Sequence, residues 1–450
     1  MSDPSATVAG ARTRTAIIGG GWAGMAAAIS ASDAGHDVSV WEAARTWGGR
    51  ARSLSVRLTD DTDAVVDNGQ HILIGAYSEC LRLMRRIGLD PDALLMRLPL
   101  EMQFPDGNGM RFPVWPAPLD ALAGIVRAQG WTLADKLSLT RAAIAWRLRR
   151  FDCPVHWTVA YLCRSVTPRV MAELVEPLCV SALNSPPETS SAQVFLRVMR
   201  DAVFGAHKGS NLLLPRTDMS ALFPDAAARW LKQRGAQMKR GLRIRQLAHD
   251  GRHWQVDSES FDQVILATAA PDAIHVLQAS LPWVAAPVAD ALRDWISIAA
   301  RLQHAAITTV YAWSADATLA RPMLALRSGR HGDAAMPAQF VFDRGQLGGP
   351  RGLLAFVVST SSTERDRLQA VVLAQAQAQL GLRLEAVSTV VEKRATIVCH
   401  PGLVRPPMAV ATGLLACGDY VTGPYPSTLE GAVRSGMAAV NHPAVAVRTG

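Results

Sequence analysis

Cysteines are few in this chain, and none of them is paired in sequence. The 450 residues contain six cysteines, at positions 80, 153, 163, 179, 399 and 417, with no C-x-x-C pair among them. Isolated thiols argue against a disulfide framework and a zinc site, and they are typical of a reducing compartment. We therefore expect a cytoplasmic protein with no bound metal.

Long hydrophobic runs and basic blocks are also missing. No uninterrupted apolar run approaches the roughly 18 residues that a membrane span needs, and the first 15 residues, "MSDPSATVAGARTRT", contain no apolar signal core. The net charge is +8, but no basic block alternates with aromatic residues and no helix-turn-helix pattern occurs, so we expect no nucleic-acid partner. A chain of this length exceeds a single core of roughly 250–300 residues, which predicts two domains.

Buried-strand patterns occur at the beginning, middle and end of the chain. "TAIIGGG" reads as a strand, the Ala-rich stretch after it as a helix that Gly35 ends, and "HDVSVWE" as a second strand. "FDQVILATAAP" and "GLLACGD" add two further strands, and "FVFDRGQLGGPRGLLAFVVS" reads as a hairpin. The fold class is therefore α/β, with a Rossmann-type domain that is discontinuous in sequence and a second, inserted domain.

Three glycines follow the first strand at the spacing G-x-G-x-x-G. Gly19 permits the tight turn, Gly21 lets a pyrophosphate approach the backbone, and Gly24 lets helix and strand pack closely. Glu42 ends the second strand, at the distance where an acidic residue binds the ribose hydroxyls of a dinucleotide. The βαβ unit alone does not distinguish NAD from FAD.

Two further motifs favour a longer ligand than NAD. Gly48, Gly49 and Arg50 follow the acidic residue and offer a second stretch of backbone and a cation to the same diphosphate. Near the end, Gly418 and Asp419 follow a strand and precede a helix, for which Ser427 and Glu430 read as an S-x-x-E capping box. The N-terminus of such a helix would stabilise the negative charge that reduction places on a flavin.

Together these motifs resemble the amine oxidase and phytoene desaturase flavoprotein superfamily. "DNGQHILIGAY", "EPLCVSALNSPPETSSAQVFLRVMRD", "LLLPRTDMSALFPDAAARWL", "EKRAT" and "GDYVTGPYPSTLEGAVRSG" are similar to the squalene-associated FAD-dependent enzymes called hydroxysqualene dehydroxylases. The resemblance implies a p-hydroxybenzoate-hydroxylase-like architecture, with residues 13–75, 211–272 and 392–445 in the FAD domain and residues 76–210 and 273–391 in a mixed substrate domain of sheet and helices. It implies FAD contacts at Gly19, Gly21, Gly24, Glu42, Gly48, Gly49, Arg50, Ile244, Gly418, Asp419, Thr428 and Leu429.

The same resemblance implies reductive removal of the hydroxyl group of hydroxysqualene, giving squalene for hopanoid synthesis. The departing hydroxyl needs a proton donor; our candidates are Glu176 and His71, with Asp67 and Tyr425 as lesser ones. Glu176 also reads as an ion-pair partner or helix cap, and His71 as a structural histidine. The rival functions are an oxidative carotenoid or phytoene-type desaturase, an amine oxidase, and a non-catalytic FAD-containing scaffold for prenyl synthases.

An electron donor and a membrane surface complete the expected partners. No second dinucleotide fingerprint occurs, so NADPH would bind transiently or a reductase would reduce the flavin. Within the segment 131–151, Leu133, Leu137, Ile144, Leu148 and Phe151 share one helical face flanked by Lys and Arg. Such a helix either packs its apolar face on the core or lies at the inner face of the cytoplasmic membrane.

Overall fold

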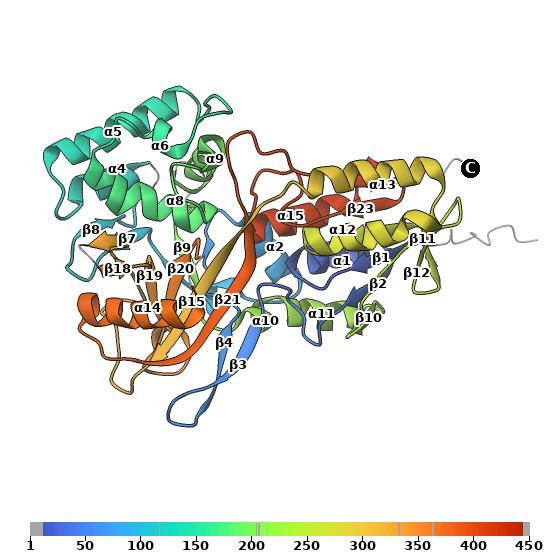
Figure 1. Cartoon of the computed structure of the whole chain (residues 1–450), viewed down its shortest axis with the longest axis horizontal. Coiled ribbons are helices and arrows are strands. Elements are labelled where there is room, and N and C mark those ends of the chain that lie inside the picture. The colour runs from blue at the N-terminus through green and yellow to red at the C-terminus, as the bar shows by residue number, and fades with distance from the viewer. Residues whose placement is uncertain are drawn as a thin grey trace, which may run out of the picture.

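The predicted βαβ unit lies in a six-stranded sheet (Figure 1). The computed structural model describes residues 12–443, apart from residues 117, 204, 206–207, 332–333 and 362–363. In spatial order the strands are β10 (Gln237–Arg240), β2 (Asp37–Glu42), β1 (Arg14–Ile18), β14 (Gln263–Leu266), β23 (Leu414–Ala416) and β22 (Ala409–Ala411). All pairs are parallel except β22 with β23. The sheet thus collects strands from the beginning, middle and end of the chain, as the discontinuous α/β fold requires.

Successive side chains of β1 point to opposite faces of this sheet, and both faces are covered by other elements. Ile17 packs with α1 (Trp22–Asp33), α11 (Pro224–Gln233) and α15 (Leu429–Val440) on one face. Ile18 packs on the other face with α12 (Ala270–Ser280), α13 (Ala286–Ala299) and the small antiparallel sheet β11 (Ala248–His249), β12 (Trp254–Val256) and β13 (Glu259–Phe261). A strand covered on both sides favours apolar residues at successive positions, which explains the apolar run from Ala16 to Ile18.

The helices α12 and α13 pack in a different domain from the one that we predicted for most of their residues. We assigned residues 273–391 to the substrate domain, but Leu277 and Trp295 belong to the apolar core on the second face of the six-stranded sheet. The indole Nε1 of Trp295 donates to the carbonyl of Pro407, just before β22, over 2.9 Å. These helices cover a face that would otherwise expose apolar side chains to water.

A second sheet of five antiparallel strands forms the other half of the molecule. Its order is β16 (Met323–Ala325), β19 (Phe340–Asp343), β20 (Leu353–Ser359), β15 (His304–Trp313) and β21 (Glu385–Ile397). β19 and β20 form the predicted hairpin, with Phe342 opposite Ala355. α14 (Arg365–Leu380) covers this sheet, and Figure 1 shows the long strands β15 and β21 running toward the Rossmann-type half.

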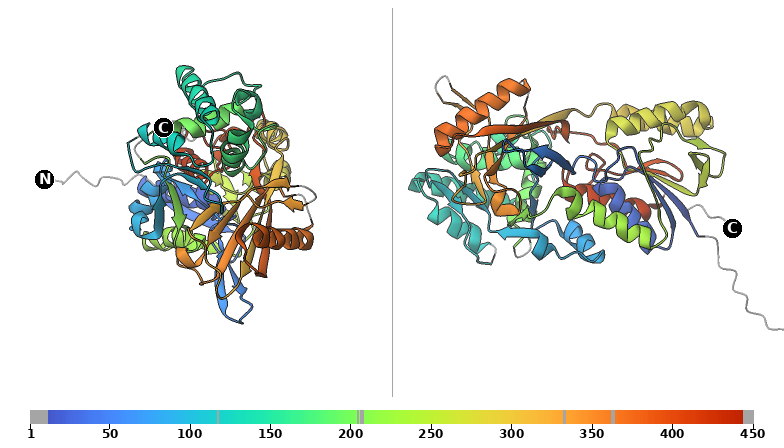
Figure 2. Two further views of the ribbon diagram at one scale, coloured as in Figure 1. Left: turned by 90° about the vertical axis from the view of Figure 1, so that its left-hand side faces the viewer. Right: turned by 90° about the horizontal axis from the view of Figure 1, so that it is seen from below.

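The predicted helical region between the first and second dinucleotide-type segments is present. It contains α2 (Ser78–Arg86), α3 (Pro91–Leu94), α4 (Leu119–Arg127), α5 (Leu133–Leu148), α6 (Val159–Leu162), α7 (Pro168–Val170), α8 (Glu176–Leu183) and α9 (Ala192–Val203). A one-turn π-helix (Met171–Val175) leads into α8. Figures 1 and 2 show α4, α5 and α6 grouped at the end of the molecule away from the six-stranded sheet.

Short strands form the remaining sheets. They are β3 (Ser53–Arg57) with β4 (Asp63–Asp67), β5 (Leu73–Ile74) with β9 (Leu212–Pro215) and β6 (Leu95–Leu98), β7 (Glu101–Gln103) with β8 (Gly109–Arg111), and β17 (Gly329–His331) with β18 (Ala334–Met336). β9, which follows the helical region, pairs with β5 and β6 near the start of that region, so the two ends of the region lie together.

Candidate functional site

The three glycines after β1 have separate structural roles. Gly19 has a φ of +115°, which favours glycine, and a Cβ at Gly24 would lie 1.9 Å from the carbonyl oxygen of Gly19. Gly24 therefore permits the close packing of α1 on β1, as predicted. A Cβ at Gly21 would meet no protein atom closer than 3.8 Å. The backbone at Gly21 is thus open on the side that lines a cavity.

The acidic residue at the end of β2 is held by the loops on either side of it. Glu42 accepts hydrogen bonds from the backbone N–H of Gly20 and of Ala44, each over 2.7 Å. Its carboxylate lines the cavity, and so does Ile244, the residue expected near the adenine. Each carboxylate oxygen keeps a second lone pair, so the group can still accept a ribose hydroxyl.

The second glycine pair lies directly against the first. The backbone N–H of Gly48 donates to the carbonyl of Gly20 over 2.9 Å, and a Cβ at Gly49 would lie 3.3 Å from the Cα of Gly21. Gly48 and Gly49 have φ values of +113° and +62°. The two glycine segments therefore form one continuous strip of bare backbone.

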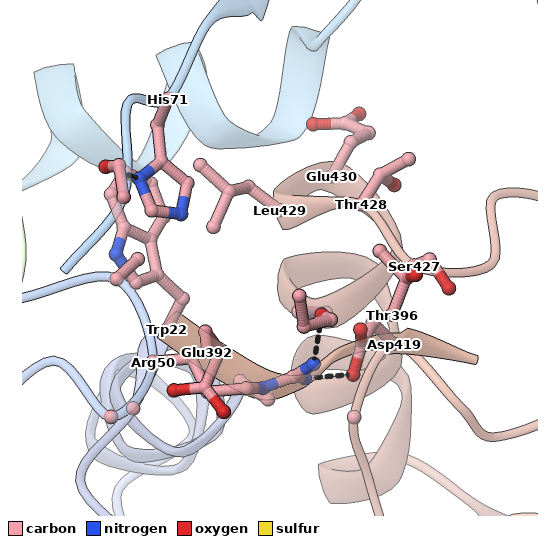
Figure 3. Close-up of a pocket in the computed structure, with 18 of the residues that line it drawn as sticks. Trp22, Arg50, His71, Glu392, Thr396, Asp419, Ser427, Thr428, Leu429 and Glu430 are labelled. Atoms are coloured by element: carbon pink, nitrogen blue, oxygen red, sulfur yellow. Dashed lines mark hydrogen bonds and ion pairs between the residues drawn. The ribbon is translucent and has the colours of Figure 1, made fainter. Parts of the chain in front are cut away.

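Arg50 connects this strip to the C-terminal motif. Its guanidinium forms an ion pair with Asp419 and donates to the carbonyl of Ala395 over 2.6 Å (Figure 3). The Asp419 carboxylate raises the pKa of Arg50, so the cation is permanent. Arg50 and Asp419 thus pair at the wall of the cavity, although they are 369 positions apart in the sequence.

The helix that follows Asp419 is capped differently from our prediction. Thr428, not Ser427, is the N-cap of α15, and its Oγ1 accepts from the N–H of Gly431 over 2.9 Å. Ser427 has a φ of +58°, and its hydroxyl accepts from the N–H of Ile397. The predicted Ser427–Glu430 capping box is therefore wrong.

Glu430 instead caps the N-terminus of a different helix, α2. Its buried carboxylate accepts from the backbone N–H groups of Glu79 and Cys80, at the N-terminus of α2, each over 3.0 Å. It also pairs with Arg434 over 2.8 Å. Because these partners are remote in sequence, the local S-x-x-E pattern could not indicate them.

A single cavity of about 930 Å³ receives all of these motifs. Its remaining walls are mainly apolar side chains of the second sheet and of α8 and α9, among them Phe340, Phe342, Val357, Leu178, Val198 and Met199. This volume lies at the upper end of the range for small-molecule sites. The cavity therefore joins a polar, glycine-rich end to an apolar end.

His71 lines this cavity, and one of its ring nitrogens is occupied. Nδ1 donates to the carbonyl of Gly69 over 2.8 Å, which places Nε2 toward the cavity (Figure 3). Burial lowers the pKa of His71, and the nearby Arg50 cation lowers it further. The imidazole is therefore mainly neutral near pH 7, and its protonated form is a stronger acid than free histidine.

Glu176, our other candidate for the proton donor, lies outside the cavity, so the structure does not support that role for it. Its side chain is exposed, and it does not line the cavity. Along α8 the cavity is lined by Leu178, Val180, Ser181 and Ala182.

Residues that the motifs did not indicate also line the cavity. The indole Nε1 of Trp22 and the Oγ1 of Thr268 are buried and have no hydrogen-bond partner among the residues that the structure describes. Glu392 lines the same space and accepts from the amide of Asn68 over 3.0 Å. Unpartnered polar atoms beside a bare backbone strip fit a polar ligand such as a dinucleotide.

Comparisons with known proteins agree with this geometry. The family described as flavin containing amine oxidoreductase matches residues 22–442. The chain is similar to a hydroxysqualene dehydroxylase from Sinorhizobium fredii, with 26% identity over 447 residues that cover 94% of this chain and 97% of the relative. A zeta-carotene desaturase from Zea mays is 32% identical over 143 residues, 31% of this chain and 24% of that protein.

A solved oxidoreductase from Methanosarcina mazei has the same fold, with a TM-score of 0.70, 16% identity, and coverage of 95% of this chain and 100% of that chain. The expectations of a FAD cofactor and of an oxidoreductase are thereby confirmed, because the matched family contains flavin. The chain belongs to the family of flavin-containing amine oxidoreductases.

Proposed function

We propose that this chain catalyses the reductive dehydroxylation of hydroxysqualene to squalene. The observation that carries the proposal is the similarity to the Sinorhizobium fredii hydroxysqualene dehydroxylase, which extends over 94% of this chain. A shared cofactor motif would explain similarity near the glycines only. Similarity of this extent includes α8, α9 and the second sheet, which form the apolar end of the cavity.

The apolar end suits an isoprenoid chain and keeps water away from the reacting carbon. Its walls carry aromatic and aliphatic side chains from β19, β20, α8 and α9. An allylic hydroxyl leaves as water, and the electron-poor carbon that remains must be protected from solvent. When bound and reduced, the flavin supplies the two electrons and the hydrogen that replace the hydroxyl.

His71 is the residue to which we assign the proton that the departing hydroxyl needs. Its Nε2 faces the cavity while Nδ1 is held by the carbonyl of Gly69. That hydrogen bond fixes the ring orientation, so a proton on Nε2 points into the cavity. Tyr425 also lines the cavity, but its hydroxyl donates to the carboxylate of Asp201 over 2.9 Å. We expect the electrons to come from NADPH or from a reductase.

The oxidative desaturase is the second candidate, because part of this chain is similar to a zeta-carotene desaturase. That similarity covers 31% of the chain, whereas the dehydroxylase similarity covers 94%. An amine oxidase and a non-catalytic FAD scaffold for prenyl synthases are further alternatives that the same fold could serve.

An anaerobic assay separates these functions. The FAD-loaded protein is reduced with dithionite, freed of excess reductant and mixed with hydroxysqualene, and the products are separated by gas chromatography. Formation of squalene together with oxidation of the flavin supports the proposal. If no squalene forms, and the oxidised protein instead desaturates zeta-carotene or another polyene, the proposal is wrong. If the flavin reacts with no isoprenoid, the scaffold is favoured.

A further inference from the structure

Exposed apolar side chains gather on one small part of the molecule. Sixteen large hydrophobic residues are exposed among those that the structure describes, and eleven of them lie within residues 114–161. These eleven, which we call the apolar patch, are Val114, Trp115, Leu119, Leu122, Val126, Leu133, Leu137, Ile144, Leu148, Val155 and Tyr161. Single exposed hydrophobic residues are ordinary, but a concentrated group marks an interaction surface.

The helix α5 presents two distinct faces. Leu139, Ala142 and Trp146 are buried, whereas the patch residues Leu133, Leu137, Ile144 and Leu148 are 52–79% exposed. At 100° per residue the exposed leucines and isoleucine span about 60°, opposite the buried positions. The prediction of a shared helical face is therefore correct for these four residues but not for Phe151. That face points to solvent and not to the core, while Phe151 lies beyond the helix end and is half-buried.

The neighbouring helix α4 extends this surface. Leu119, Leu122 and Val126 are exposed at spacings of three and four residues, while Ala121 and Ile125 are buried. The ammonium group of Lys136 on α5 donates to the carbonyl of Val126 over 2.7 Å, which ties the two helices together. The patch thus spans two adjacent helices and the loops beside them.

Positive charge surrounds the apolar patch. Residues 113–170 contain eight Lys or Arg and three Asp. Two of these acids, Asp120 and Asp135, are buried. On α5, Lys136 and Arg147 lie on one side of the exposed apolar face and Arg141 on the other. An apolar face with a cationic border complements a bilayer whose headgroups are anionic.

Aromatic side chains lie at the margin of the patch beside arginines. The guanidinium of Arg127 lies 5.0 Å from the ring centre of Trp115, and that of Arg164 lies 4.3 Å from the ring of Tyr161. Trp and Tyr prefer the boundary between hydrocarbon and headgroups, where one end of the ring is apolar and the other is wet. No helix in the described part of the chain is long and apolar enough to cross a membrane.

We propose that the apolar patch docks this protein on the surface of an anionic phospholipid bilayer. Leu133, Leu137, Ile144 and Leu148 would enter the boundary of the acyl chains, and the surrounding Lys and Arg side chains would contact lipid phosphates. This inference rests on the surface alone and would hold for a different substrate.

Vesicle flotation of the full-length, FAD-loaded protein tests the proposal. We expect binding to vesicles that contain phosphatidylglycerol, and weaker binding at high salt or to pure phosphatidylcholine. The double variant Leu137→Gln, Ile144→Gln should bind at least ~10-fold less, because it removes apolar groups from the lipid boundary. Trp283→Gln, Val404→Gln, which changes exposed hydrophobic residues outside the patch, should bind like the wild type.

The cationic border is tested separately. Arg141→Gln, Arg147→Gln should lower the affinity for anionic vesicles about 5-fold per arginine, whereas Arg365→Gln, Arg367→Gln on α14 should have a smaller effect. Circular dichroism and flavin content check that every variant is folded. Equal binding by the wild type and Leu137→Gln, Ile144→Gln would overturn the proposal. A wild-type protein that does not bind vesicles would also overturn it. The same holds if the wild type does not bind because the patch is buried in a dimer, which Leu137→Gln, Ile144→Gln would then dissociate.

Discussion

The carboxylate of Glu430 connects two helices that lie far apart in the sequence. It accepts from two N–H groups at the start of α2 and pairs with Arg434 on its own helix, with 1% of Glu430 exposed. At the N-terminus of a helix a carboxylate satisfies donors that have no partner within the helix. Glu430 therefore helps to fix the position of α2 against α15, together with Arg434, whose guanidinium donates to the hydroxyl of Ser78 over 2.8 Å.

Replacing Glu430 by alanine should destabilise the protein by about 2–3 kcal/mol, because two buried N–H groups and Arg434 lose a charged partner. Chemical denaturation followed by circular dichroism measures the free energy of unfolding. Glu385→Ala, at an exposed position on β21, is the control and should change it by less than ~0.5 kcal/mol. A Glu430→Ala value as small as that of the control would contradict the role in capping α2.

His71 gives a pH-dependent prediction. Burial lowers its pKa below 6.5, so activity that needs the imidazolium should fall as the pH rises through that lowered pKa. For the same reason the folded state favours neutral His71, and its contribution to stability is lost as the pH falls below 6.5.

The variant His71→Gln should lower kcat by about 100-fold or more while FAD remains bound, since general acid catalysis contributes roughly 10²–10⁴-fold. Glu176→Gln is the matched control, and it should retain activity because Glu176 is exposed outside the cavity. Single-turnover rates across pH 5 to 8 measure both effects. An unchanged rate and pH profile in His71→Gln would remove this residue from the mechanism.

At the scale of an element, the turn between β1 and α1 separates packing from ligand binding. Gly21 has a φ of −79°, which any residue adopts, and its Cβ position is open. Gly24 has no such room, because its Cβ would lie 1.9 Å from the carbonyl oxygen of Gly19. The two glycines of one motif should therefore respond differently to the same substitution.

We expect Gly24→Ala to lower the stability by about 3 kcal/mol or to prevent folding, since the added methyl group meets rigid backbone. Gly21→Ala should fold normally but raise the FAD dissociation constant by ~10-fold or more, which is about 1.4 kcal/mol. Thermal unfolding of the apoprotein and a fluorescence titration with FAD measure the two effects. A Gly21→Ala variant that binds FAD like the wild type would argue against a diphosphate at this backbone.

Elements whose pattern is local could be predicted from the sequence. β1, α1 and β2 follow one another within thirty residues, and the β19–β20 hairpin is likewise continuous, so periodicity and glycines suffice. The orientation of Glu176 on α8 depends on which face packs toward a cavity built by other segments. The partners of Glu430 and the position of α13 depend on contacts between distant parts of the chain, which no short pattern contains.

At the scale of the whole molecule, the Arg50–Asp419 pair joins the first cofactor segment to the last. Asp419 is 7% exposed, and no local motif links it to Arg50. A double-mutant cycle of Arg50→Met and Asp419→Asn should give an interaction energy of about 1–3 kcal/mol in the free energy of unfolding. The exposed pair Arg57–Asp63 is the control and should give less than ~0.5 kcal/mol. Additive effects of the Arg50 and Asp419 substitutions would show that the pair does not hold these segments together.

The cavity joins both halves of the molecule, and the proposed function depends on what its glycine-lined end binds. Equilibrium titration of the apoprotein with FAD, with folding verified by circular dichroism, measures this most directly. We predict one FAD bound per chain, with a flavin spectrum that changes on binding and with weaker binding in Gly21→Ala. A folded chain that stays colourless and binds no FAD would contradict the assignment of the cavity and the proposed dehydroxylation with it.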